Sequence, residues 1–262
     1  MESNSGDPGP LETMATLNTV EEVARGVFRH RYVAPAIADG AEPGQFVQIE
    51  VSHLAFPVTR RPFTVSRVME EEGAFEIVFE VVGRGTAILA SSIPGRSLSV
   101  MGPLGRGYRT AEGSWALIGG GMGAAGFPFL SERVDVRLAI LGARSTEQLL
   151  PCEAGELLIA TEDGSRGRCG LVTDLVFEAC LDRYDHLALC GPLPMMHAVV
   201  EFLTEDVLER TQVSAESRMA CGWGVCEGCV IPCVDGYRKC CTDGPVFPAS
   251  DIDWAGWMEL CG

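Results

Sequence analysis

Residues 117–125 read Leu-Ile-Gly-Gly-Gly-Met-Gly-Ala-Ala, and this stretch decides the fold of the central part of the chain. Trp115–Ile118 is apolar at strand length, and the residues after the glycines are predicted to be helical to about Arg133. A glycine-rich turn between a strand and a helix lets the backbone approach a phosphate, and the helix N-terminus supplies N–H donors. The glycine order is not Gly-x-Gly-x-x-Gly, so for this loop alone a simple tight turn stays open.

Strands and helices are predicted to alternate on the C-terminal side of this loop. Strands are expected at Val136–Leu141, Glu156–Thr161 and His186–Cys190, and helices at Leu171–Cys180 and Pro192–Leu203. This alternation predicts right-handed βαβ units around a parallel α/β sheet over residues 113–213. Three candidate binding residues end the last of these strands, at the sheet edge that carries the glycine loop and where open α/β sheets bind ligands: Cys190, Gly191 and Pro192.

The N-terminal side of the loop has a period-two pattern instead. Runs at Gln45–Val51, Phe63–Met69 and Phe75–Val82 read as short strands separated by Gly and Pro. Closely spaced strands of this kind predict an antiparallel β-barrel or sandwich over residues 15–112. Residues 1–14 are polar and rich in Gly and Pro, and are expected to form a disordered tail.

Two motifs in this N-terminal region have the chemistry to hold a phosphorylated ring system. In Arg61-Pro62-Phe63-Thr64 the guanidinium can bind a phosphate, the aromatic ring can pack on another ring, and the hydroxyl can bond a ring nitrogen. Gly83-Arg84-Gly85-Thr86 follows a later strand and offers a second phosphate cradle. Each motif alone could equally be a solvated turn. Their occurrence together is what favours a binding site for a phosphorylated ring system.

Composition and charge exclude several classes of protein. The chain has 262 residues, 47% of them apolar, which is enough to bury more than one core. A formal net charge of −16 opposes binding to phosphate backbones, so no nucleic-acid partner is expected. The longest apolar run, residues 115–130, is interrupted by five glycines and a proline, so no membrane partner is expected either. No signal peptide is recognised at the N-terminus.

The cysteines are concentrated near the C-terminus: of eleven in the chain, seven follow residue 220. An odd number without a signal peptide indicates a reducing compartment, and we expect a cytoplasmic protein with a metal site. Cys221, Cys226 and Cys229 have the C-x₄-C-x₂-C spacing of plant-type [2Fe–2S] ligation, which needs a fourth cysteine downstream. A structural zinc site and inert buried thiols are the alternatives. Spacing does not choose the fourth ligand among Cys233, Cys240 and Cys241.

Taken together, these motifs resemble the ferredoxin–NADP reductase superfamily. More narrowly, residues 17–248 resemble the electron-transfer subunits of type B dihydroorotate dehydrogenases. The resemblance implies a flavin site at Arg61, Pro62, Phe63, Thr64, Val78, Phe79, Glu80, Gly85 and Thr86. It implies a nicotinamide-nucleotide site at Gly119, Gly120, Gly121, Gly123 and at Thr161, which begins a Thr-Glu-Asp-Gly-Ser turn.

The same resemblance covers the cysteine segment, from Arg218-Met219-Ala220-Cys221-Gly222 to Asp243-Gly244-Pro245-Val246-Phe247. In that family the last cluster ligand stands two residues before Asp-Gly-Pro-Val-Phe, which implies Cys241 as the fourth ligand. The chain departs from the family pattern in having Thr64 for serine, Gly126 in place of the proline after Ala125, and two additional cysteines, Cys233 and Cys240.

The implied protein carries FAD and a [2Fe–2S] cluster and uses NAD, in three parts: a barrel for FAD at 15–112, an α/β sheet for NAD at 113–213, and a cluster module at 214–262. Its implied partner is an FMN-containing dihydroorotate dehydrogenase catalytic subunit, in a heteromer that serves pyrimidine biosynthesis. No acid–base catalyst is predicted, because the four histidines read as structural: His30, His53, His186 and His197.

Several alternatives stay open on the sequence. Subunits of hydrogenases, sulfur reductases or bifurcating transhydrogenases carry the same cofactors, and a zinc-stabilised binding module carries none of them. The direction of electron flow and the oligomeric state are not specified. The choice between NAD and NADP is also open, with Arg144 a candidate partner for a 2′-phosphate.

Overall fold

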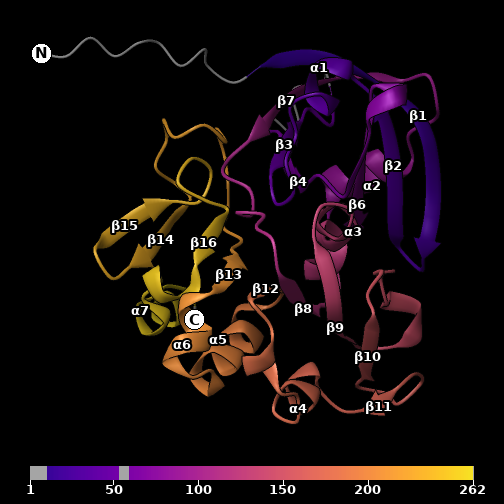
Figure 1. Cartoon of the computed structure of the whole chain (residues 1–262). Coiled ribbons are helices and arrows are strands. Elements are labelled where there is room, and N and C mark those ends of the chain that lie inside the picture. The colour runs from indigo at the N-terminus through magenta and orange to yellow at the C-terminus, as the bar shows by residue number, and fades with distance from the viewer. Residues whose placement is uncertain (1–10, 53–58, 262) are drawn as a thin grey trace, which may run out of the picture.

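The computed structural model describes residues 11–52 and 59–261, in which three regions follow one another along the chain (Figure 1). The indigo-to-magenta strands of the first region lie at the top of Figure 1, with the second sheet below them and the yellow C-terminal segment beside that sheet. His53 and most of the expected N-terminal tail lie outside the described residues.

The first region is a seven-stranded sheet of order β4-β3-β7-β1-β2-β6-β5, in which every neighbouring pair is antiparallel. Its core is apolar and is formed by side chains on the inner face of the strands, among them Leu17, Tyr32, Phe75 and Ile77. The strands are β1 (Glu12–Ala24), β2 (Val27–Val33), β3 (Phe46–Ile49), β4 (Arg61–Thr64), β5 (Arg67–Met69), β6 (Ala74–Glu80) and β7 (Ser97–Leu104). The helices between them are α1 (Pro35–Ala38), η1 (Glu70–Glu72) and α2 (Arg84–Ala90).

The two edges of this sheet are joined by the chain itself. β4 and β5 are the outer strands, and only Val65 and Ser66 separate them. Val65 N–H donates to Gln45 O on one edge at 3.0 Å, and Ser66 N–H donates to Glu76 O on the other at 2.8 Å. The sequence pattern predicted one strand over 63–69; the structure has two, because the chain crosses there between opposite edges.

The second region is a seven-stranded sheet of order β11-β10-β9-β8-β12-β13-β16. All neighbouring pairs are parallel except β13–β16. Its strands are β8 (Ser114–Gly120), β9 (Asp135–Ala143), β10 (Glu156–Thr161), β11 (Arg168–Cys169), β12 (His186–Cys190), β13 (Thr211–Ser214) and β16 (Val246–Pro248). The connections contain η2 (Gly121–Gly126), α3 (Phe127–Ser131), η3 (Thr146–Gln148), α4 (Val172–Val176), η4 (Leu181–Arg183), α5 (Leu193–Phe202) and α6 (Glu205–Glu209).

The strand order places a topological switch point in the middle of this sheet. From β8 the chain proceeds outward through β9 and β10, and then returns to the other side of β8 with β12. Loops that leave neighbouring strands in opposite directions open a crevice at the carboxyl ends of the strands. The crevice here lies between the loops that follow β8 and β12.

The third region is the C-terminal segment. It contains a hairpin of β14 (Val230–Cys233) and β15 (Gly236–Lys239), followed by η5 (Ala249–Asp251) and α7 (Trp254–Cys261). Between these elements β16 returns to the second sheet and pairs antiparallel with β13. Cysteine and apolar side chains of the segment share one hydrophobic core with the second sheet, so the segment is held by its neighbours.

Three boundaries differ from the sequence expectation. β1 begins at Glu12, inside the expected tail, because Glu12–Met14 pair with the end of β7. The helix expected over Leu171–Cys180 is limited to Val172–Val176. The segment from residue 214 onward is not a separate unit, because β16 is a strand of the second sheet.

Candidate functional site

Two loops pack backbone to backbone at the switch point. A Cβ at Gly123 would lie 2.5 Å from the carbonyl carbon of Cys190 and 2.6 Å from the backbone nitrogen of Gly191. Gly120 is equally confined, by Met195 and Pro192. Gly121, with φ of +54°, opens to the crevice, since a Cβ there would meet no atom within 4 Å. The glycines predicted from sequence therefore have two roles. Gly120 and Gly123 let the two loops pack closely, and Gly121 faces the crevice.

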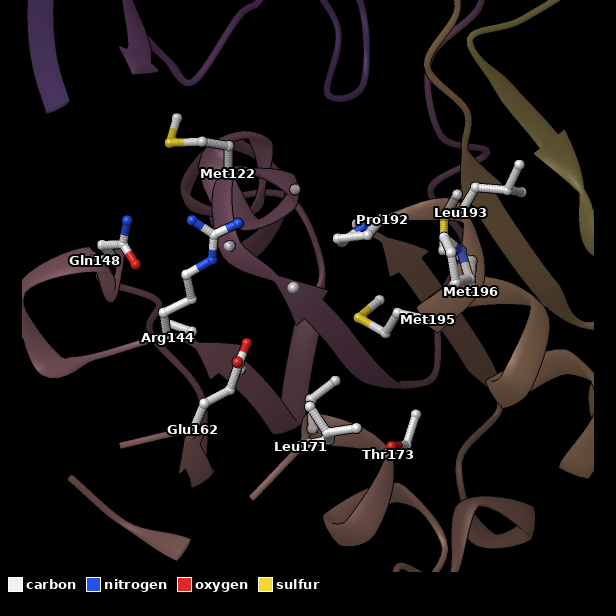
Figure 2. Close-up of a pocket in the computed structure, with 18 of the residues that line it drawn as sticks. Met122, Arg144, Gln148, Glu162, Leu171, Thr173, Pro192, Leu193, Met195 and Met196 are labelled. Carbon is white, nitrogen blue, oxygen red and sulfur yellow. The ribbon is translucent and has the colours of Figure 1, made fainter. Parts of the chain in front are cut away.

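A cavity of about 760 Å³ lies at these loops, and all three regions contribute to its wall (Figure 2). Val27 and Glu80 come from the barrel, and Glu216 and Trp257 come from the C-terminal segment. Figure 2 shows the polar side chains of Arg144, Gln148 and Glu162 grouped at one side of the cavity, and the apolar Pro192, Met195 and Met196 at the other. The cavity is large enough for a nucleotide and has distinct polar and apolar ends.

Several cavity residues were not singled out from sequence. Glu216 lines the wall, and burial raises the pKa of its carboxyl. Trp257 is 2% exposed and reaches the cavity from α7, near the end of the chain. Met122, Gln148 and Glu162 also line it. Met122 and Glu162 carried a sequence signal, because Met122 lies in the glycine-rich loop and Glu162 follows the predicted Thr161.

Thr161 itself is placed in the turn and not in the cavity wall. It is fully buried, and its hydroxyl donates to Arg166 O at 2.8 Å and accepts from Arg166 N–H at 3.0 Å. Both bonds hold the turn that follows β10. Glu162, the next residue, lines the cavity, and its own N–H donates to Ala143 O at 3.1 Å.

The residues of the two flavin-type motifs lie against each other. The Nε atom of Arg61 would be 2.9 Å from a Cβ at Gly85, so the guanidinium lies flat on the first turn of α2. Arg61 also donates to Thr59 O at 2.7 Å. The hydroxyl of Thr86 accepts from the N–H groups of Val82 and Gly83 at 3.0 and 3.2 Å, and so caps α2. Thr86 builds this turn with its side chain, which leaves the backbone of the turn to meet a phosphate.

Two aromatic side chains of the motifs point away from any ring bound outside the barrel. Phe63 and Phe79 belong to the barrel core, where their ring centroids are 5.4 Å apart. Strand alternation turns the Phe63 ring inward, and its packing on a bound ring system stays a prediction. Their neighbours Pro62, Thr64, Val78 and Glu80 are half-buried on the outer face.

Thr64 and Gly126, which both depart from the family pattern, are in contact. The Cγ2 methyl of Thr64 lies 2.9 Å from the position of a Cβ at Gly126. A serine at 64 lacks that methyl, and a proline at 126 needs that space. The two departures therefore lie side by side at the junction between the barrel and the glycine loop, where a larger residue at 126 would meet the Thr64 methyl.

The cysteine loop runs from β13 to β14, and no helix or strand is formed between Ser214 and Val230. Its turns need positive φ values at Gly222 (+80°), Gly224 (+86°) and Glu227 (+51°). Backbone N–H groups point at sulfur: Cys226 N–H donates to Cys221 Sγ at 3.4 Å, and Gly224 N–H donates to Cys241 Sγ at 3.2 Å. Such N–H···S bonds stabilise thiolates and cluster sulfides.

Four of the thiols are arranged as two pairs. The Cys226 side chain helps to lower the pKa of Cys221, and the Cys229 side chain helps to raise the pKa of Cys241. Burial raises the pKa of Cys221, but backbone N–H groups from Trp223, Cys226 and Val225 outweigh it and lower the pKa to about 6. Among the described residues no three metal-ligating side chains converge on one point. A [2Fe–2S] cluster takes two protein ligands at each iron, so two pairs of thiols on an N–H-lined loop fit this group.

The other two candidate ligands face elsewhere. Cys240 Sγ donates to Ala215 O at 3.3 Å inside the core, and burial raises the pKa of this thiol. Cys233 is buried near Arg238 and Asp235 on the hairpin, away from the loop. Of the three cysteines left open by spacing, Cys241 is the one whose sulfur accepts the N–H of Gly224, at 3.2 Å, between the first two cysteines of the motif.

The described histidines are engaged in packing. His30 is fully buried in the barrel, where its Nδ1 is 3.0 Å from Tyr32 Oη. His186 packs on Trp115 with ring centroids 4.8 Å apart. His197 lies 3.6 Å from Glu201 and stacks on Trp254. Each histidine thus has a structural role.

An antiparallel barrel joined to a parallel sheet, with a nucleotide-sized cavity at the switch point, defines a reductase of the ferredoxin–NADP reductase type. Solved structures agree with this class. The chain superimposes with a TM-score of 0.83, at 29% identity and over 94% of its length and 92% of the other chain, on the structure described as "Insights into flavin-based electron bifurcation via the NADH-dependent reduced ferredoxin-NADP oxidoreductase structure". A ferredoxin NADP⁺ reductase from Neisseria gonorrhoeae with bound FAD and NADP shares the fold at a TM-score of 0.62 and 14% identity, covering 77% of this chain and 97% of that one.

Sequence relatives narrow the class. Residues 216–253 match the iron-sulfur cluster binding domain of dihydroorotate dehydrogenase B. The "Dihydroorotate dehydrogenase B (NAD(+)), electron transfer subunit" of Fusobacterium nucleatum subsp. nucleatum is 34% identical over 255 residues, which is 90% of this chain and 97% of the relative. The protein of the same name from Bacillus cereus (strain Q1) is 34% identical, over 88% of this chain and 95% of the relative. The chain belongs to the family of dihydroorotate dehydrogenase B electron transfer subunits.

Proposed function

We propose that this chain passes electrons between a dihydroorotate-oxidising partner subunit and NAD, as the electron-transfer subunit of a heteromeric enzyme of pyrimidine biosynthesis. The names of its relatives, with 90% of the chain aligned, support the partner and the nucleotide. The observation that carries the proposal is the single cavity walled by the barrel, the parallel sheet and the C-terminal segment. The glycine loop, Glu80 at the end of β6 and Glu216 of the segment that carries the cysteines thereby line one cavity.

We assign FAD to the barrel, residues 15–112, and NAD to the sheet, residues 113–213. Bound FAD exchanges hydride with a nicotinamide and single electrons with a [2Fe–2S] cluster. Arg61, lying on Gly85, presents a guanidinium to the flavin phosphates, and Thr64 presents a hydroxyl beside the glycine loop. Val78 and Glu80 line the outer face of β6, whereas Phe63 and Phe79 support the two strands from within.

The NAD site comprises the glycine loop and the loop after β12. Gly121 and Gly123 bring the backbone of the glycine loop to the cavity, and Pro192 forms the opposite wall. Gly120, Cys190 and Gly191 lie where the two loops meet, Gly119 lets the glycine loop pack on Phe127 and Leu141, and Thr161 holds the turn after β10 through Arg166. Arg144 and Glu162 enter the polar end of the cavity, where they are placed to bind the ribose and phosphate groups of the nucleotide.

For the cluster in residues 214–262 we propose the ligands Cys221, Cys226, Cys229 and Cys241. The support is their arrangement as two sulfur pairs and the N–H groups aimed at Cys221 and Cys241. Cys226 is exposed, and Trp223 and Val225 beside it are 47% and 68% exposed. Apolar side chains around an exposed ligand indicate that the partner subunit docks at this loop.

The first experiment is to purify the chain alone and with its partner subunit. The chain alone is expected to reduce an artificial acceptor with NADH and to leave dihydroorotate unchanged. The complex is expected to reduce NAD⁺ with dihydroorotate. Dihydroorotate oxidation by the isolated chain would contradict the proposal, as would a preparation that contains stoichiometric zinc and no acid-labile sulfide.

A second candidate function is electron bifurcation between nicotinamide nucleotides and a ferredoxin, with a different partner. It is favoured by the superposition on the bifurcating oxidoreductase at a TM-score of 0.83. A pull-down of the tagged chain from its own cells separates the two candidates. Recovery of a subunit that oxidises dihydroorotate supports the first, and recovery of one that reduces ferredoxin supports the second.

We also place the protein in the cytoplasm. The ten cysteines described in the structure are all free, as a reducing compartment favours. No described helix has the length and apolar character to cross a membrane. Fractionation of the source cells tests this assignment.

A further inference from the structure

The third residue of β3, Gln48, is a polar side chain enclosed between the barrel and the cysteine loop. It lies between Val47 and Ile49, which both belong to the barrel core, so alternation directs Gln48 to the outer face. On that face it pairs with Pro62 of β4 on one side and with Met101 of β7 on the other. Its exposed fraction is 0%.

The cover over Gln48 is the cysteine loop. A Cβ at Gly222 would lie 2.7 Å from both Cγ and Nε2 of Gln48 and 3.0 Å from its Cδ. The carboxamide is thus pressed on the backbone of the residue after Cys221. Since Pro62 belongs to the Arg61–Thr64 motif, Gln48 separates the strand assigned to FAD from the loop assigned to the cluster.

The carboxamide has no partner within the described residues. Neither Nε2 nor Oε1 of Gln48 forms a hydrogen bond there, although both atoms are inaccessible. A buried amide without partners is unfavourable, and a methionine or leucine fills the same volume without that cost. The local polar groups of the loop are directed elsewhere, since the N–H groups of Gly224 and Cys226 point at sulfur. The N–H donor of Gln48 therefore needs an acceptor that is supplied by the group bound in the cysteine loop.

We infer that the carboxamide N–H of Gln48 donates a hydrogen bond to a sulfur of the cluster held beside Gly222, and thereby raises its reduction potential. This inference rests on the proposed function. Reduction adds one electron and one negative charge to the iron–sulfur group, and a hydrogen-bond donor stabilises the more negative state. Gln48 is in this role a tuning residue on the flavin side of the cluster, and no bond to it is made or broken.

The test is a redox titration of the full-length chain in complex with its partner, with the reduced cluster followed by electron paramagnetic resonance. Gln48→Met keeps the volume and removes the donor. It is expected to shift the one-electron equilibrium against reduction by roughly tenfold, which corresponds to about 59 mV. Met101→Leu is the matched control, since it changes the adjacent side chain on the same face without changing a polar group, and it is expected to leave the potential in place.

A second measurement uses the unmodified side chain, in case Gln48→Met retains too little cluster. Glutamine labelled with ¹⁵N at the amide is incorporated, and hyperfine coupling to the reduced cluster is sought by pulsed resonance. Coupling in wild type that is lost in Gln48→Asn supports the hydrogen bond. No ¹⁵N coupling, or equal potentials in Gln48→Met and Met101→Leu, overturns it. A wild-type sample without any cluster signal instead refutes the proposed function, so the two failures are distinct.

Discussion

The nucleotide cavity and the cysteine loop are built by different means. The cavity is formed by short loops between regular strands, in which Gly123 packs on the backbone of Cys190 and Gly191. The cysteine loop has no regular element over residues 215–229 and is shaped by positive φ values and N–H···S bonds. The difference teaches that the cavity is complete in the protein alone, whereas the loop depends on what its sulfurs hold.

The largest expected effect comes from the loop. Cys241→Ser removes a proposed ligand and is expected to lower dihydroorotate-dependent NAD⁺ reduction by the complex more than roughly 100-fold. NADH oxidation with an artificial acceptor should remain, because the glycine loop and the loop after β12 pack on each other without any of the proposed cluster ligands. Iron and labile-sulfide content and both activities check this. Cys240→Ala is the control and should keep its cluster, since Cys240 bonds to Ala215 O. Loss of the cluster in Cys240→Ala with retention in Cys241→Ser would reverse the ligand assignment.

The converse experiment breaks the cavity and spares the loop. Gly123→Ala places a methyl 2.5–2.6 Å from the backbone of Cys190 and Gly191, which cannot yield as a side chain does. We expect a loss of about 3 kcal/mol in stability and a tenfold or larger rise in the KM for NADH, with cluster content unchanged. Thermal unfolding and steady-state kinetics measure both. Gly121→Ala is the comparison on the cavity side of the same loop, because its methyl meets no atom within 4 Å and should cost less stability than Gly123→Ala in spite of the φ of +54°.

A third prediction extends the comparison to the barrel, whose core contains His30. Burial lowers the pKa of His30 to about 4 from an ordinary 6.5. Since the unfolded chain takes up the proton at higher pH than the folded chain, stability is complete above pH 6.5 and falls as the pH drops toward 4. The loss amounts to roughly 2–3 kcal/mol.

Denaturant unfolding between pH 7.5 and 4 measures this loss. His30→Gln preserves a hydrogen-bonding group next to Tyr32. The variant is expected to lose about 2–3 kcal/mol less unfolding free energy than the wild type between pH 6.5 and 4. Parallel curves for the variant and the wild type over the whole pH range would show that His30 does not cause it.

The smallest effect is expected at the junction of Thr64 and Gly126. Gly126→Ala puts a Cβ 2.9 Å from the Thr64 methyl and should cost about 1–2 kcal/mol. Thr64→Ser removes that methyl, so the double variant should regain most of the loss. A double-mutant cycle on the free energy of unfolding measures the coupling. Additive costs would mean that the two departures from the family pattern arose independently.

Local patterns predicted the local parts of the fold. β10 and β12 have the bounds expected from their apolar runs, and the glycine loop and the loop after β12 meet as the parallel-sheet argument requires. The parts that sequence missed depend on contacts between distant residues. The crossing at Val65 and Ser66 follows from closure of the first sheet, and β16 exists because Val246–Pro248 find an open edge at β13.

The candidate site shows the same division. Spacing located the cysteines, but the choice of Cys241 over Cys240 depends on which sulfur the folded hairpin turns toward the loop. Alternation gave β4 and β6 two faces without saying which is inner, so the inward direction of the Phe63 ring could not be predicted. The burial of Gln48 could not be predicted from its strand, because the residue that covers it, Gly222, lies far along the chain.

The return of the chain through β16 also governs how this protein can be cut and recombined. The chain leaves the sheet after β13, forms the cysteine loop and the hairpin, and returns to the sheet as β16. This strand of three residues pairs with the outer edge of β13. A truncation after residue 214 strips that edge of its partner and presents bare backbone donors and acceptors to other molecules. A transplant of the loop onto another reductase therefore has to carry Val246–Pro248 with it, together with an edge strand to receive them.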